Sequence, residues 1–367
     1  VQSAFQSAGQ RCSALRVLFV QNEIADDLLE MLAGATACLT VGDPALPATD
    51  LGPLIDSAAH QHISSYCATQ DAAGRRLFGG ETVKQLHAQQ RLTLSADETI
   101  DSVRLSNLSG QLLAPVAYEI GAISELKSEI FGPVLHVVRF APDAVDAVVD
   151  QINATGYGLT FGLQSRIDLR VKDVCRRIRA GNAYVNRNQI GAVVGVQPFG
   201  GEGLSGTGPK AGGPHYLSAF CRISLPVLPP LKSTALSRGS ADQTPTALSE
   251  QIAQFQGSAY ELRASERIAS LQANVKRLPA SWQPRVASWL AQALLLLDED
   301  LLDGPTGETN RLRLVPRGVL LCTGAARGEE IAEQVALARL CTQIIKALAL
   351  GNAVVVTGDA RAQAVDL

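Results

Sequence analysis

The first 224 residues alternate between two kinds of apolar pattern. Short apolar runs predict buried strands at 15–21, 133–140, 160–165 and 182–186. Apolar residues recur at helical spacing at 23–39, 143–152 and 168–181. We expect Gly181 to cap the last of these helices. Strands that are separated by helices of this length predict an α/β fold with a parallel sheet.

The pattern changes after residue 224. A proline-rich stretch at 225–246 has little periodicity, and we interpret it as a linker or an extended strap. Helical spacing returns at 247–275 and 281–298, and a strand, a helix and a strand follow at 312–324, 328–349 and 352–358. The sequence therefore predicts a first α/β domain at 1–224 and a second, partial Rossmann-like domain at 247–367.

Composition narrows the class of protein. With 46% hydrophobic and 18% charged residues, the chain is typical of a globular protein. The net charge of −3 gives no basic footprint for nucleic acid, and the longest apolar run, at 289–297, is too short to cross a bilayer. The seven cysteines form no CxxC pair and no metal-like spacing with the five histidines, so we expect no metal site and a cytoplasmic location.

The stretch "QSAGQRCSALR" raises the first chemical candidate. Cys12 has an arginine on either side, Arg11 and Arg16, and polar neighbours around one sulfur. Positive charge or backbone N–H groups stabilise a reactive thiolate, but a free cysteine is also among the most buried residue types. The residues alone leave both a packed thiol and a nucleophile open for Cys12.

Two further stretches have ambiguous chemistry. In "SEIFGPVLHV", Glu129 and Phe131 precede a strand, where a carboxylate suits a pair of sugar hydroxyls and a ring suits a flat ligand. A loop acid beside a core phenylalanine is the alternative.

The glycine-rich stretch at 188–217 has no helical pattern, and its backbone N–H groups suit an anion. It lacks a GxGxxG pattern after a strand and the P-loop lysine spacing, so a structural loop remains the alternative.

Taken in order, "GQRCSA", "EIFGPV", "YGLTFGLQS", "GNAYVN" and "PFGGEGLSGTG" resemble the catalytic half of the aldehyde dehydrogenase superfamily. "FQSAGQRCSALRVLFVQ" and "FGGEGLSGTGPKAGGPHYL" are similar to the Δ1-pyrroline-5-carboxylate (glutamate semialdehyde) dehydrogenase module of bifunctional proline utilization A proteins. The resemblance covers residues 1–224. It implies an aldehyde dehydrogenase-type catalytic domain that oxidises L-glutamate γ-semialdehyde to L-glutamate with NAD, the second step of proline degradation.

The resemblance assigns a role to each matching residue. Cys12 matches the family nucleophile, which attacks the aldehyde carbon to give a thiohemiacetal and then a thioester. Its own backbone N–H would help to hold the oxyanion, and we expect Cys12 to lie in a polar, helix-start-like setting. Glu129 matches the acid that binds the nicotinamide-side ribose, and Phe131 matches its neighbour against the cofactor.

Substrate binding is assigned in the same way. Ser13, Gly191 and Ala192 match the positions that hold the substrate α-carboxylate with one hydroxyl and two backbone N–H groups, and Phe199 matches an aromatic wall of that pocket. Backbone donors suit this role because an arginine buried there would perturb the neighbouring thiolate.

The resemblance also implies parts that this sequence does not include. The family's general base is a glutamate upstream of the nucleophile, and the oxyanion asparagine and the cofactor domain proper are not found here, so we expect a longer protein. Proline utilization A proteins also carry an FAD-containing proline dehydrogenase domain, which would lie upstream. A homo-oligomer, such as a dimer, and a small-molecule substrate are implied, without nucleic acid or a transmembrane segment.

The second half resembles a cofactor domain that has lost its ligand residues. Cys322-Thr323-Gly324 stand where the family carries Trp-Asn, and Thr357-Gly358 stand where it carries a ribose-binding lysine and a proline. This predicts an aldehyde dehydrogenase-like domain without catalytic function at 247–367. Two alternatives stay open for the whole chain: a dehydrogenase for another carboxylated semialdehyde, such as succinate semialdehyde, and a non-catalytic structural or lid module.

Overall fold

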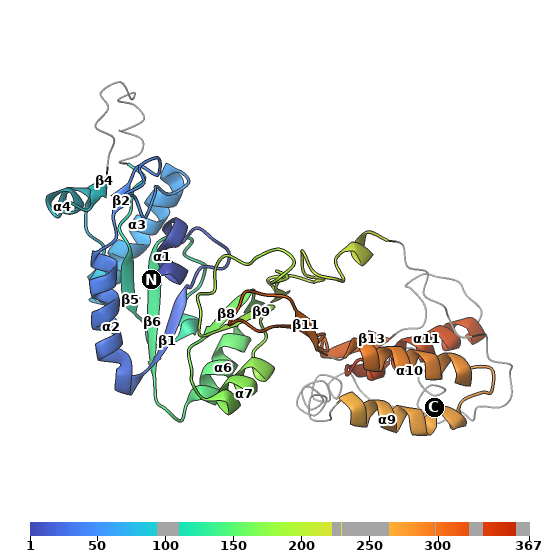
Figure 1. Cartoon of the computed structure of the whole chain (residues 1–367). Helices are drawn as coiled ribbons and strands as arrows, with labels where there is room; N and C mark the ends of the chain where they lie inside the picture. The colour runs from blue at the N-terminus through green and yellow to red at the C-terminus, as the bar shows by residue number, and fades with distance from the viewer. Residues whose placement is uncertain (94–109, 222–228, 230–263, 298, 323–332, 357–367) are drawn as a thin grey trace. The chain divides into compact units, whose positions relative to one another are not determined.

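The structure is a computed structural model of the whole chain. It describes residues 1–93, 110–221, 229, 264–297, 299–322 and 333–356. The chain forms two compact units, Val1–Phe220 and Cys221–Leu367, and each is described by itself (Figure 1). The predicted strap at 225–246 lies outside the described residues, apart from Pro229.

A four-stranded sheet forms the centre of the first unit, in the order β1-β6-β5-β3. These strands are β1 (Val17–Gln21), β6 (Val134–Phe140), β5 (Val116–Glu119) and β3 (Arg76–Gly79). β6 pairs in parallel with both β1 and β5, whereas the edge strand β3 is antiparallel to β5. The predicted α/β fold is confirmed, but a wholly parallel sheet is wrong, because β3 returns alongside β5 in the opposite direction.

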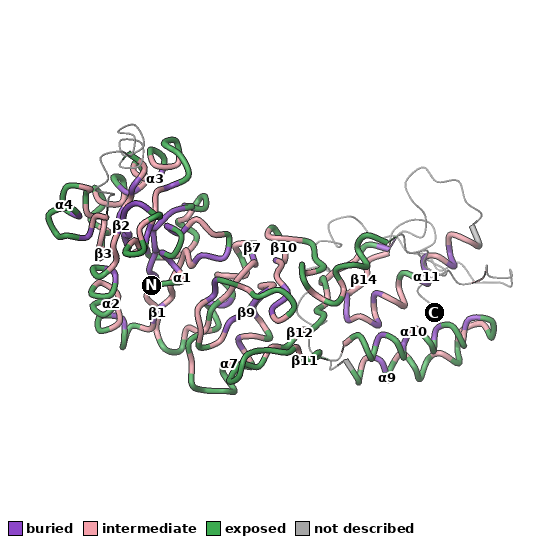
Figure 2. The backbone as a smooth tube through the Cα atoms, turned by 45° about the horizontal axis from the view of Figure 1, so that its top comes forward, coloured by how far each residue is buried: buried purple, intermediate pink, exposed green. Residues whose placement is uncertain are grey.

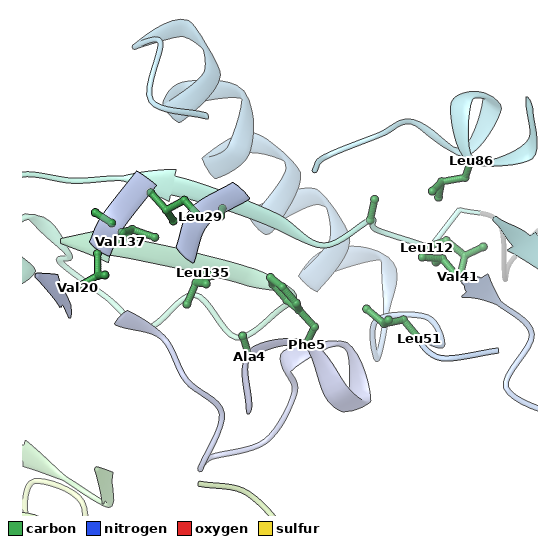
Figure 3. Close-up of a cluster of buried hydrophobic side chains, with 13 residues drawn as sticks. Ala4, Phe5, Val20, Leu29, Val41, Leu51, Leu86, Leu112, Leu135 and Val137 are labelled. Carbon is green, nitrogen blue, oxygen red and sulfur yellow. The ribbon is translucent and has the colours of Figure 1, made fainter. Parts of the chain in front are cut away.

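Helices pack against this sheet and close its core. They are α1 (Gln2–Phe5), α2 (Asn22–Ala37), α3 (Ser57–Ala72) and α4 (Val83–Ala88), with a short parallel pair β2 (Val41–Gly42) and β4 (Leu92–Thr93) nearby. Phe5 of α1, Leu29 of α2 and Leu135 of β6 belong to one buried cluster (Figure 3). The inner strands β5 and β6 are largely buried, while the outward turns of α2 are exposed (Figure 2).

A smaller parallel pair carries the rest of the first unit. β8 (Thr160–Leu163) pairs with β9 (Asn182–Val185), and α6 (Val145–Ala154) and α7 (Asp168–Arg177) pack on them through Val149, Val174 and Phe161. Short elements complete this region: η1 (Gln6–Gly9), η2 (Ile123–Glu125), η3 (Leu217–Phe220), and the antiparallel pair β7 (Tyr157–Gly158) and β10 (Glu202–Gly203).

Gly181 does not cap the helix as predicted. α7 ends at Arg177, and Ile178 is already extended, with φ −68° and ψ 133°. The glycine serves a close approach instead, because a Cβ on Gly181 would lie 1.7 Å from the carbonyl oxygen of Gly200. Its small size lets the start of β9 pass directly against the glycine-rich stretch.

The second unit consists of helices around a short parallel strand pair. The helices are α9 (Ala264–Asn274), η4 (Val275–Arg277), α10 (Gln283–Leu296) and α11 (Glu333–Ala349). The parallel pair is β13 (Val319–Cys322) and β14 (Ala353–Val356). A separate antiparallel hairpin consists of β11 (Asp300–Leu302) and β12 (Asn310–Leu312). Trp282 and Leu290 of the α10 region pack with Leu337 of α11 in its core. The predicted strand–helix–strand order is therefore present over the described residues. None of the described helices is long and apolar enough to cross a membrane.

A histidine side chain is buried inside the central sheet. His136 of β6 is 1% exposed, its Nε2 lies 2.7 Å from the hydroxyl of Tyr66, and its Nδ1 lies 3.0 Å from the carbonyl oxygen of Arg16. Burial lowers the pKa of His136, and the nearby Arg16 charge lowers it further, although the Arg16 carbonyl opposes this. The neutral imidazole is thus the form that the folded protein prefers.

Because the folded state disfavours protonation of His136, stability is predicted to fall as pH drops below about 6.5, where an unfolded histidine takes up a proton. His136→Gln should flatten this loss between about pH 6.5 and 5. Urea unfolding midpoints at pH 7 and pH 5.5 measure the effect. The exposed His87, in the last turn of α4, provides the control variant His87→Gln. An equal pH dependence in both variants would contradict the assignment.

Candidate active site

Cys12 lies on the turn between η1 and β1. The backbone N–H of Ala14 donates to the carbonyl oxygen of Arg11 at 3.0 Å, which closes the turn around Cys12. Cys12 is exposed, whereas Ser13 is 6% exposed. The predicted helix-start setting is wrong, because the segment continues into a strand. The alternative of a packed thiol is also wrong, since the side chain is open to solvent.

The approach to this turn requires a glycine. Gly9 has φ +65°, and a Cβ there would lie 2.1 Å from the carbonyl oxygen of Gly132. The two stretches "GQRCSA" and "EIFGPV" therefore touch backbone to backbone, although they are more than a hundred residues apart in the chain. A side chain at Gly9 would push the Cys12 turn away from the Glu129 loop, residues 126–133.

Arg16 joins the same two stretches through its side chain. Its Nε donates to Oε1 of Glu129 at 2.9 Å, and its Cζ lies 4.8 Å from the ring centroid of Phe131. The Arg16 side chain is only 16% exposed, whereas that of Glu129 is 53% exposed. Arg16 is thus a mostly buried arginine that interacts electrostatically with Cys12. Glu129 supplies the opposite charge, which makes burial of this cation tolerable.

A cleft of about 550 Å³ opens beside the Glu129 loop. Its lining residues are Gln10, Ile55, Ala59, His62, Ile63, Glu129 and Phe131. Carboxylate Oε2 of Glu129 has no hydrogen-bond partner among the described residues. A free carboxylate oxygen and an exposed ring beside an apolar-walled cleft fit a ribose and a flat heterocycle.

Sequence reasoning missed Gln10 and His62 as lining residues of this cleft. Gln10 accepts a hydrogen bond from the N–H of Ile55 at 2.8 Å and donates to the carbonyl oxygen of Pro53 at 3.2 Å. Ala59 and His62 are three residues apart, on one face of the first turns of α3. The signal for His62 was that helical spacing, but α3 itself was not predicted.

On the other side of Cys12, Gln189 fastens the glycine-rich stretch to the turn. Its Nε2 donates to the carbonyl oxygen of Ser13 at 3.2 Å, and the hydroxyl of Thr160 donates to the same oxygen at 3.3 Å. Gln189 is 7% exposed, so this anchor is buried. It places the start of the predicted substrate loop, two residues before Gly191, next to the Cys12 turn.

Several predicted donors have no partner within the described part of the chain. The backbone N–H groups of Cys12, Gly191 and Ala192 and the hydroxyl of Ser13 form no hydrogen bond with any described group. Gly191 adopts φ +76°, a conformation that glycine adopts readily. These donors remain available for an external acceptor. Such an acceptor could be an oxyanion or a carboxylate.

Phe199 is held differently from the other predicted site residues. Its backbone N–H and carbonyl oxygen both pair with Ala211, at 3.0 and 2.9 Å, in an isolated antiparallel bridge. Its side chain is half-buried. No described hydrogen bond links Phe199 to Cys12 or Ser13, so its place in a pocket wall stays a prediction.

The other cysteines differ from Cys12 in their surroundings. Burial raises the pKa of Cys67 and Cys322, and it raises the pKa of Cys341 to about 12. Cys38 and Cys221 are exposed. Over the residues that the structure describes, no group of three histidine, cysteine or acidic side chains is placed to hold a metal ion.

Comparison with known sequences gives one family match. The pattern of the Aldehyde dehydrogenase family matches residues 1–95 and 121–225. Over 362 residues the chain is 41% identical to "Bifunctional protein PutA" of Escherichia coli (strain K12), a match that covers 98% of this chain and 24% of that protein. Over 219 residues it is 34% identical to "1-pyrroline-5-carboxylate dehydrogenase" of Bacillus subtilis (strain 168), covering 59% of this chain and 38% of that one.

Solved structures give the same relationship. A crystal structure of a point mutant of Bradyrhizobium japonicum proline utilization A matches with a TM-score of 0.50 and 48% sequence identity. The match covers 60% of this chain and 20% of that one. The chain thus spans about a quarter or less of the length of the bifunctional relatives that it matches.

Cys12 is predicted to be the fastest-reacting thiol of the chain. Its side chain is exposed, and the guanidinium of Arg16 interacts with it electrostatically. Brief iodoacetamide treatment at neutral pH, followed by mass spectrometry of peptides, should label Cys12 at least about tenfold faster than the exposed Cys38. Preferential labelling of Cys38, Cys175 or Cys221 would contradict the prediction.

Proposed function

This chain belongs to the aldehyde dehydrogenase family, and from that premise we propose that it carries the nucleophile and substrate-binding half of an NAD-dependent L-glutamate γ-semialdehyde dehydrogenase. The product would be L-glutamate. Relatives named as PutA and as 1-pyrroline-5-carboxylate dehydrogenase support the substrate class. Because the chain spans 24% of the Escherichia coli relative, we propose that it acts within a longer, bifunctional polypeptide.

One observation carries the proposal. The exposed Cys12 lies on a turn that is bound on one side to the Glu129 loop, through Arg16, and on the other side to the glycine-rich stretch, through Gln189. In an NAD-dependent aldehyde dehydrogenase, the aldehyde carbon must lie within reach of the nucleophile and of the cofactor, while an anchor holds the rest of the substrate. The proposed roles require this arrangement.

Cofactor binding is assigned to the cleft beside the Glu129 loop. Oε2 of Glu129 is available to accept hydrogen bonds from the nicotinamide-side ribose, and Phe131, exposed to 41%, is available to contact a flat ring. Ile55 and Ile63 add apolar walls. When bound, NAD supplies the acceptor for the hydride that leaves the substrate.

Cys12 provides the covalent chemistry of the proposal. Its thiolate adds to the aldehyde carbon, a C–S bond forms, and the carbonyl electron pair moves to oxygen. The unpartnered N–H of Cys12 is placed on the nucleophile itself and can donate to that oxyanion. After hydride loss a thioester remains, which water cleaves to free the carboxylate and the thiol. The resemblance assigns activation of thiol and water to a glutamate that precedes Cys12 in the family.

Recognition of the substrate carboxylate is assigned to Ser13, Gly191 and Ala192. Their free donors would hold the anion without bringing a second cation to the site. Phe199 would line the same pocket. Another carboxylated semialdehyde, such as succinate semialdehyde, would use the same donors, so chain length must separate the two substrates.

NADH formation by the polypeptide that carries this chain tests the proposal. L-glutamate γ-semialdehyde should react with at least about tenfold higher kcat/KM than pentanal, because the buried hydroxyl of Ser13, left without a partner, costs about 1–3 kcal/mol. Cys12→Ala should abolish NADH formation. Equal kcat/KM for pentanal would refute the carboxylate anchor, and higher kcat/KM for succinate semialdehyde would favour the other dehydrogenase.

For the second half, we propose an aldehyde dehydrogenase-like domain at 247–367 that binds no NAD. β13 and β14 pair in parallel, and α11 packs against both, as in the first units of a nucleotide-binding sheet. The ligand positions differ from those of the family: Thr323 and Gly324 follow β13, and Thr357 and Gly358 follow β14. These four residues lie outside the described ones. Without these donors, the cost of ordering a dinucleotide is not recovered.

Hydrogen exchange of the NAD-reducing polypeptide that carries this chain tests this absence of binding. Millimolar NAD should leave the exchange of peptides from β13 and β14 unchanged, because no ligand covers them. Peptides around Phe131 serve as the internal comparison in the same sample. Protection of β13 and β14 at micromolar NAD would overturn the proposal.

A further inference from the structure

Arg16 makes more contacts than a surface ion pair requires. It stands between the Cys12 turn and β1, and its side chain is 16% exposed. Nη1 donates to the carbonyl oxygen of Gly9 at 2.6 Å, and Nη2 donates to that of Arg11 at 3.0 Å. One guanidinium thus holds the backbone before Cys12 at two points, three residues and one residue upstream of the thiol.

The same guanidinium holds the Glu129 loop. Nε and Nη2 both lie 2.9 Å from Oε1 of Glu129, and Nη1 reaches the carbonyl oxygen of Gly132 at 3.5 Å. The face of the guanidinium lies against Phe131, with 4.8 Å from Cζ to the ring centroid. Only Oε1 of the carboxylate is engaged, so the contact fixes the rotation of the carboxylate and leaves Oε2 available.

The charges fit this arrangement. Burial lowers the pKa of Arg16, and attraction to Glu129, then to Cys12, raises it again. An arginine remains protonated in either case. The cation therefore interacts with both groups to which the proposed function gives an anionic role: the ribose-binding acid and the thiol.

We propose that Arg16 is a positioning residue that sets the carboxylate of Glu129 for the ribose and holds the Cys12 turn against the bound cofactor. This inference rests on the proposed function and goes beyond it, because Arg16 itself contacts no reacting atom. Loss of the guanidinium would leave Glu129 free to rotate and the Cys12 turn free to move away from the cleft. Cofactor affinity and thiol reactivity should then change together.

The experiment compares Arg16→Gln with Arg11→Gln in the NAD-reducing polypeptide that carries this chain. Arg11 is a matched control because it adjoins Cys12 in sequence and carries the same charge. Within the described part of the chain, its side chain bonds only to the hydroxyl of Ser7, at 2.9 Å. Arg16→Gln should raise KM for NAD by about tenfold or more, since charge-assisted hydrogen bonds are lost. KM for the aldehyde should change by less than about twofold, and Arg11→Gln should change neither value much.

A second readout needs no turnover. Iodoacetamide labelling of Cys12 should slow by about tenfold in Arg16→Gln and remain near the unmodified rate in Arg11→Gln. Arg16→Lys keeps the charge but cannot make the forked contact, so it should restore labelling more than it restores KM for NAD. If Arg16→Gln does not fold, Arg16→Lys and Glu129→Gln provide the same comparison from the two sides of the ion pair.

The outcomes separate this inference from the proposed function. If Cys12 of the unmodified protein is inert and no NADH forms, the proposed function fails. If the unmodified protein is active but Arg16→Gln and Arg11→Gln have the same KM for NAD and the same labelling rate, only the role of Arg16 fails. A rise in KM for the aldehyde alone would also overturn it, because a cofactor-side residue should not act there.

Discussion

The candidate site depends on the parallel pairing of β1 with β6. Val17 pairs with His136 in this register, so the residues that lead into both strands emerge at one edge of the sheet. Cys12 precedes the first strand and Glu129 precedes the second. A shift by one residue would turn the buried Val20 and Val137 to the opposite face, so burial of the core also fixes the distance between the two stretches.

This placement explains why the site is built from loops. Ligand crevices of open α/β sheets usually lie at the carboxyl ends of the strands. Here the polar cluster lies at the amino ends of β1 and β6, where the chain arrives rather than leaves. Gly9 and Gly132 allow the two arriving segments to touch, and Arg16 ties them together. The strand pairing fixes where the two segments lie, and these three residues fix how closely the segments approach each other.

Local patterns predicted much of the fold and little of the middle of the first unit. The apolar runs gave β1, β6, β8 and β9 because each has a short branched or aromatic core. The helix α3 was not predicted, because only Ile63 and Cys67 are buried along its sixteen residues and the rest is polar or small. β3 and β5 are four residues each, too short for a period to show. The motif residues were found by resemblance, but their contacts depend on pairings across the chain that no local pattern contains.

The burial of Arg16 and its partners could not be predicted from residue types alone. A buried arginine beside a thiol looks unfavourable, because an isolated cation loses its hydration. In the structure three carbonyl oxygens and Oε1 of Glu129 replace that hydration, and the carboxylate balances the charge. The Arg16–Glu129 pair is then neutral overall, and the guanidinium still interacts electrostatically with Cys12. The arginine that was expected to disturb a thiolate is instead the group that joins the turn at Cys12 to Glu129 and Phe131.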